Sequence, residues 1–116
     1  MIALTSTLCV FVAVGSTDLR RGFDGLAQVA REALTQDPMA GHLFVFANRR
    51  RNRIKILYWD GDGYAIGMKR LEQGTYRWPG ADATHVEIKA AELAAMLGGI
   101  DLATTRRRVR YVAAGV

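Results

Sequence analysis

The first third of the chain combines an apolar run with an amphipathic stretch. Residues 8–14 are apolar and rich in β-branched side chains, which predicts a buried strand. From Phe23 onward, apolar residues recur at helical spacing, which predicts a helix that ends before Pro38. Two glycines disfavour the start of this helix, so we expect Asp24 to cap a helix that begins near Gly25.

In the middle of the chain the apolar period changes from about 3.6 residues to about 2. Residues of high β propensity gather in four segments separated by polar turns: 42–46, 54–59, 64–71 and 75–78. We interpret these segments as an antiparallel β-meander. The Asp-Gly pairs of residues 60–63 favour a tight turn with positive φ, so the two segments beside them should form a hairpin.

After Pro79 a polar loop leads to a second predicted helix, which ends at Gly98 and Gly99. Its expected apolar face consists of Ile88, Ala91, Leu93, Ala94, Met96 and Leu97. The predicted fold class is therefore α+β: one small domain in which an antiparallel meander is packed by an N-terminal helix and a short C-terminal helix. We expect this domain to span residues 1–103 and a basic C-terminal tail to span 104–116.

Composition narrows the class of protein further. The chain has 116 residues, 50% of them hydrophobic, which is enough for one domain with a core of its own. Cys9 is the single cysteine, so neither an internal disulfide nor a multi-cysteine zinc site can form. The longest apolar run, residues 8–15, is far shorter than the roughly 20 residues that a membrane helix needs, and no basic residue precedes it as in a signal peptide. We expect a cytoplasmic protein without a membrane partner.

The positive charge of the chain is concentrated in two short segments. The formal net charge is +5, from 16 Lys plus Arg against 11 Asp plus Glu. Eight of the 13 arginines lie in two segments without acids: Arg49, Arg50, Arg51 and Arg53, then Arg106, Arg107, Arg108 and Arg110. Without these eight, the rest of the chain carries a net charge of −3. A charge excess this local predicts an anionic partner.

Several short motifs, spread over almost the whole chain, resemble those of one protein family. They read TDLRRGFDGL at 17–26, GHLFVF at 41–46, KILYWDG at 55–61, KRLE at 69–72, RWP at 77–79 and GIDL at 99–102. In this order they resemble the accessory proteins encoded by the second reading frame of the insertion sequences numbered sixty-six (TnpB or Orf2 type). The resemblance implies a small cytoplasmic protein of a mobile element, needed beside a separate, larger transposase that carries the strand-transfer chemistry. It brings no assigned catalytic residues.

The two arginine clusters are the candidate nucleic-acid contacts. The first lies between two predicted strands, where arginine side chains can reach phosphates and bind them bidentately. The second resembles a basic tail, with Tyr111 available for stacking. The alternatives are a solvated loop and a tail without a partner. The predicted binding residues are Arg49, Arg50, Arg51, Arg53, Lys55, Arg106, Arg107, Arg108 and Arg110.

Other reactive residues support simpler interpretations. Asp60 and Asp62 alternate as in a calcium loop, but Asp-Gly at a hairpin tip requires no metal. Asp18 and Asp24 stand where helix caps belong, so a metal nuclease site is disfavoured. The two histidines lack a neighbouring nucleophile, and Cys9 lies in an apolar run as a buried thiol does. We therefore expect no catalytic residue, no metal and no cofactor.

Aromatic residues crowd the predicted meander, and strand alternation should turn some of them outward. They are Tyr58, Trp59, Tyr64, Tyr76 and Trp78. An exposed set of this kind serves either base stacking or protein docking.

Two functions follow as hypotheses. The first is a non-enzymatic transposition accessory protein that binds DNA through its arginines and assists the transposase. The second is an adaptor that docks on the transposase or on another accessory protein of the element and has no DNA affinity of its own. The sequence gives no indication of the oligomeric state.

Overall fold

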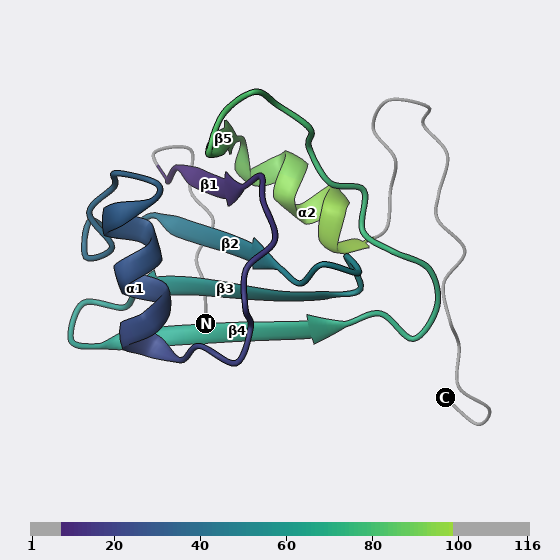
Figure 1. Cartoon of the computed structure of the whole chain (residues 1–116). Helices are drawn as coiled ribbons and strands as arrows, with labels where there is room; N and C mark the ends of the chain where they lie inside the picture. The colour runs from purple at the N-terminus through teal and green to yellow at the C-terminus, as the bar shows by residue number, and fades with distance from the viewer. Residues whose placement is uncertain (1–7, 99–116) are drawn as a thin grey trace.

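The computed structural model describes residues 8–98, which form a five-stranded, mostly antiparallel sheet with two helices (Figure 1). The strand order is β4-β3-β2-β1-β5, and β1 is parallel to β2. The strands are β1 (Val10–Ala13), β2 (Leu43–Ala47), β3 (Arg53–Trp59), β4 (Tyr64–Arg70) and β5 (His85–Ile88). This arrangement confirms the predicted α+β class. The predicted boundary between domain and tail lies outside the described residues.

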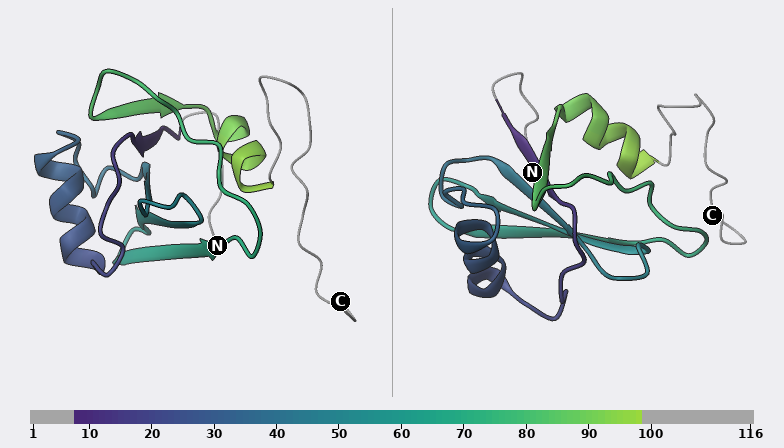
Figure 2. Two further views of the ribbon diagram at one scale, coloured as in Figure 1. Left: turned by 45° about the vertical axis from the view of Figure 1, so that its right-hand side comes forward. Right: turned by 45° about the horizontal axis from the view of Figure 1, so that its top comes forward.

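Helix α1 (Phe23–Glu32) connects the two parallel strands, which pair Val10 with Leu43 and Val12 with Val45. A crossover is required here because parallel strands cannot be joined by a tight hairpin. Helix α2 (Ala90–Gly98) follows β5 and covers the opposite face of the sheet (Figure 2). Neither helix of the described chain is long and apolar enough to cross a bilayer.

Two apolar layers lie on opposite faces of the sheet, because successive strand residues point to opposite sides. One layer packs α1 against β1, β2 and β3 through Phe11, Leu26, Ala27, Ala30, Phe44, Phe46 and Leu57. The other packs α2 through Val10, Val12, Leu43, Val45, Ile54, Ile56 and Leu93. Both faces of the central strands are therefore covered, as the continuous apolar run in β1 indicates.

The predicted hairpin is confirmed between β3 and β4. Their pairing runs from Arg53 opposite Arg70 to Trp59 opposite Tyr64. The turn closes with a bond of 2.8 Å from the Asp60 N–H to the Gly63 carbonyl.

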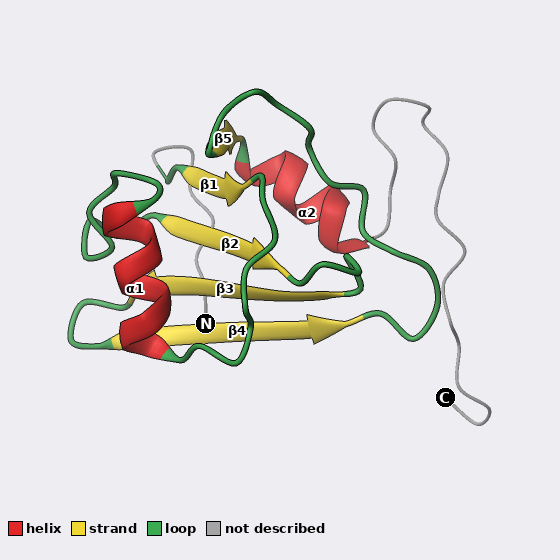
Figure 3. Ribbon diagram, in the orientation of Figure 1, coloured by secondary structure: helices red, strands yellow, loops and turns green. Residues whose placement is uncertain are grey.

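The predicted strand at residues 75–78 is wrong. This segment has no ladder partner and instead crosses the α2 face as a loop, shown in green in Figure 3. The Tyr76 N–H donates to the Arg51 carbonyl (2.7 Å), and the Trp78 indole Nε1–H donates to the Ala13 carbonyl (2.8 Å). Both residues attach this loop to the rest of the fold. Their backbone and side chains bond to the β2–β3 turn and to β1 and do not pair with a neighbouring strand, so their β propensity does not produce a strand.

Two boundaries also differ from the prediction. Ile88 belongs to β5, where it pairs with Val10, and α2 begins only at Ala90, because the free edge of β1 recruits residues 85–88 as a strand. Helix α1 begins at Phe23, ends at Glu32 and has Gly22 as its N-cap without a side-chain cap. Asp24 lies in the first turn, where its charge favours the helix dipole but does not cap the helix.

Candidate nucleic-acid interface

The first arginine cluster occupies the turn between β2 and β3, and Asn48 fixes the shape of this turn. Its side-chain oxygen accepts hydrogen bonds from the Asn52 N–H (3.2 Å) and the Arg53 N–H (3.0 Å). Its amide nitrogen donates to the Asn52 side chain at 2.7 Å. The turn is therefore held by its own side chains, while Arg49, Arg50 and Arg53 remain exposed.

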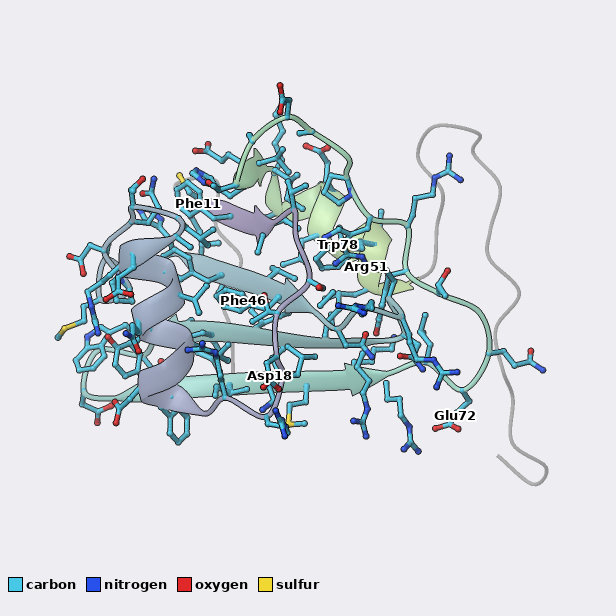
Figure 4. All side chains as sticks on the ribbon, viewed as in Figure 1. Phe11, Asp18, Phe46, Arg51, Glu72 and Trp78 are labelled. Carbon is cyan, nitrogen blue, oxygen red and sulfur yellow. The ribbon has the colours of Figure 1, made fainter. Side chains whose placement is uncertain are left out.

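Arg51 points inward, unlike the other three arginines of the cluster. Its backbone has φ of +58°, and its Nη2 donates to the Val14 carbonyl at 2.8 Å. The guanidinium carbon lies 5.1 Å from the ring centroid of Trp78, within the range of a cation–π contact (Figure 4). Burial lowers the pKa of the Arg51 guanidinium through desolvation. Arg51 thus anchors the turn, and three arginines of the cluster face solvent.

A cavity of about 480 Å³ lies between this turn and the segment that connects β1 to α1. The Thr17 N–H donates to the Ala47 carbonyl (2.8 Å) and so holds this segment at the end of β2. We call this cavity the linker crevice; it is lined by Ser16, Thr17, Asp18, Leu19, Arg20, Asn48, Arg49 and Arg53.

The charges in the linker crevice are unequal. Asp18 and Arg20 form an exposed ion pair at 2.8 Å, and the Arg20 backbone N–H also donates to Asp18 at 3.0 Å. Hydrogen bonds from Arg20 lower the pKa of Asp18 to about 2. Neither Arg49 nor Arg53 forms an ion pair with a carboxylate in residues 8–98. The crevice therefore has an excess of positive charge at neutral pH.

A second hollow of about 340 Å³ adjoins the first at Leu19 and Arg53. We call it the strand hollow; it is lined by Leu19, Arg53, Ile54, Lys55, Met68, Lys69, Arg70 and Glu72. Its cations other than Arg53 already have partners, and Lys69 donates to the Leu97 carbonyl at 2.7 Å. The Lys55 ammonium donates to the Arg21 carbonyl (2.9 Å), and Arg70 pairs with Glu72 at 3.0 Å.

The structure brings Arg49, Arg53 and Lys55 around these two adjoining cavities, with Arg50 exposed in the turn next to them. Arg20 and Arg70 join them, although sequence reasoning had not selected either. Their signal in the sequence is weak, because each arginine stands two residues from an acid that can neutralise its charge. The predicted tail residues Arg106, Arg107, Arg108 and Arg110 lie outside the described part of the chain.

The remaining candidate groups lie away from the two hollows or within the core layers. All five aromatic residues of the predicted exposed set are buried or half-buried, with Trp59 and Tyr64 packed edge to face at 5.1 Å. Residues 8–98 contain no group of three His, Cys, Asp or Glu side chains arranged to hold a metal. Half-buried Cys9 donates its backbone N–H to His42 Nδ1 at 3.2 Å.

Comparison with known proteins identifies the family. A family model described as IS66 Orf2-like protein matches residues 8–107. Two proteins of Sinorhizobium fredii are similar to this chain, the uncharacterized proteins y4hO and y4jC. The first is 40% identical over 79% of this chain and 80% of the relative, and the second is 32% identical over 93% and 92%. No solved structure matches the chain significantly. The chain therefore belongs to the IS66 Orf2-like family and has an accessory role in an IS66 transposition system.

Proposed function

We propose that this protein is a non-enzymatic DNA-binding accessory factor of transposition, which holds DNA by its phosphates while a separate transposase performs the strand transfer. The transposase and another accessory protein of the element are its proposed protein partners. One observation carries the proposal: Arg49 and Arg53 line a shared crevice and have no carboxylate partner in residues 8–98.

The chemistry of these side chains favours backbone binding over base readout. A guanidinium presents a planar set of donors that matches two phosphate oxygens. Phosphate contacts of this kind fix the position of a protein on DNA and carry little sequence information. Arg50 extends the same surface, and Lys55 adds charge beside it. The arginines at 106–108 and 110 are proposed as further contacts.

The test is a salt titration of binding to a DNA duplex from the end of the element, followed by fluorescence anisotropy. Each phosphate contact contributes about −0.9 to the slope of log K against log salt, so five contacts give a slope of about −4.5. We expect the double variant Arg49→Gln, Arg53→Gln to bind more weakly and to lose about 1.8 of that slope.

Arg31→Gln is the control, because Arg31 is an exposed arginine in the last turn of α1 and lines neither hollow. Its slope should equal that of the parent protein. If duplex binding at low salt occurs only when transposase is present, the adaptor hypothesis replaces this proposal. Nicking of supercoiled DNA by the purified protein with magnesium would contradict the non-enzymatic part.

A further inference from the structure

The linker crevice lies at the end of the sheet where the chain leaves the parallel strands β1 and β2. The segment after β1 and the turn after β2 form its two walls. Its volume, about 480 Å³, lies within the usual range of small-ligand pockets.

Both walls of the crevice are fixed before any ligand arrives. The bond from Thr17 to Ala47 joins the first wall to the end of β2. Asn48 shapes the second wall, and Arg51 ties that wall to the Val14 carbonyl at the start of the first. A site whose walls are already joined loses little conformational entropy on binding.

The charges lining the crevice select an anion. Three guanidiniums, those of Arg20, Arg49 and Arg53, share it with the single carboxylate of Asp18. That carboxylate already accepts three side-chain hydrogen bonds from Arg20, at 3.0, 3.2 and 2.8 Å. The remaining excess of two positive charges matches the one or two negative charges of a phosphate group. The hydroxyl-bearing residues Ser16 and Thr17 also belong to the lining and suit phosphate oxygens.

The composition of the lining also limits what part of a nucleic acid can bind. No aromatic side chain lines the crevice, so it offers no platform for base stacking. The neighbouring strand hollow adds no further free cation, because Lys55, Lys69 and Arg70 already have partners and Arg53 lines both hollows. The free donors therefore gather on the side of Arg49 and Arg53.

We infer that the linker crevice is a subsite for a single phosphate group of a nucleic-acid strand, bound by Arg49 and Arg53 beside the ion pair of Arg20 with Asp18. The inference rests on the proposed function and deepens it, since it separates one phosphate site in an open crevice from the rest of the basic surface. Its ligand is phosphate chemistry, supplied either by a strand terminus or by a phosphodiester within the strand.

The experiment uses a thymidine trinucleotide with and without a 5′-phosphate as the probe, followed by NMR of the arginine Nε–Hε groups of the whole chain. We expect saturable shifts of the Arg49 and Arg53 signals and little shift of Arg50. Arg53→Gln should weaken the affinity for whichever trinucleotide binds by roughly tenfold or more, because a charge-assisted hydrogen bond is lost. Preferential binding of the phosphorylated probe identifies a strand terminus, and equal binding identifies internal phosphodiesters.

Arg50→Gln removes the same charge from the same turn outside the crevice. It should weaken duplex binding but change the affinity for the trinucleotide by less than about twofold, since only screened long-range attraction is lost. If Arg50→Gln lowers the affinity for the trinucleotide as much as Arg53→Gln does, the phosphate subsite is ruled out. Unchanged amide spectra of both variants establish that the fold is intact.

The two proposals fail separately. Duplex binding with an undiminished salt slope, but with no shift at Arg49 or Arg53 from either probe, would overturn the subsite and leave the proposed function standing. Trinucleotide binding in the crevice without any duplex affinity would overturn the proposed function and leave the phosphate subsite standing.

Discussion

Arg51 and its three neighbours have the same side chain but different roles. Arg49, Arg50 and Arg53 are exposed, whereas the Arg51 guanidinium contacts Val14 and Trp78. Its Nη1 is buried without a hydrogen-bond partner in the described part of the chain. Burying this atom has a cost, but the hydrogen bond to Val14 and the contact with Trp78 are made in a partly buried site, where both are stronger than at the surface.

Arg51→Ala should therefore destabilise the protein by about 2 kcal/mol, because a charged hydrogen bond and a cation–π contact are both lost. Arg51→Gly loses the same contacts but relieves the positive φ, so its effect should be about 0.5–1 kcal/mol smaller. Urea denaturation measures the free energy of unfolding of both variants. Arg50→Ala is the matched control and should stay within about 0.5 kcal/mol of the parent protein. Equal stability of the Ala variants at 50 and 51 would contradict the anchoring role.

At the scale of elements, the β3–β4 hairpin was predictable because all of its signals are local. Two segments of high β propensity are separated by Asp-Gly pairs, and Gly61 adopts φ of +89° in the turn. Strand β5 and the loop at 75–78 were not predictable in this way. Their structure depends on pairing with β1 and on hydrogen bonds to Arg51 and Ala13, which are distant in sequence.

Gly61→Ala should destabilise the protein by about 1–2 kcal/mol, because an L-residue is strained at positive φ. Gly63→Ala in the same turn is the control. A Cβ at Gly63 meets no atom within 4 Å and its φ is not positive, so the change should be neutral or stabilise by up to about 1 kcal/mol. The difference between their free energies of unfolding measures the backbone strain. A destabilisation of similar size in both variants would show that some other contact of the turn dominates.

For the whole molecule, the decisive feature is one sheet shared by two apolar layers. Phe46 of β2 belongs to the layer between α1 and the sheet. Leu93 of α2 belongs to the layer between α2 and the sheet, and both side chains are fully buried. Because the strands between them are common to both layers, the described fold should lose both layers together.

Phe46→Ala and Leu93→Ala should each destabilise the protein by about 2–5 kcal/mol through lost contacts and a residual cavity. Circular dichroism and tryptophan fluorescence should still give one coincident transition for each variant. Met68→Ala, at a side chain that is 72% exposed, should change the stability by no more than about 0.5 kcal/mol. Two separate transitions in Leu93→Ala would mean that α2 unfolds independently of the sheet.

The sequence by itself determined the features that depend on neighbouring residues. These are the helical and strand periods, the hairpin turn and the acid-free arginine run that selected Arg49 and Arg53. Only the tertiary structure decided the parallel pairing of β1 with β2, which creates the linker crevice and brings Arg20 to the same site. It also decided that Arg51 turns inward, since its partner Val14 is 37 residues away and Trp78 lies on a separate loop. Local patterns fix backbone preference and side-chain periodicity, whereas hydrogen-bond partners, cavities and uncompensated charges arise only when distant segments meet.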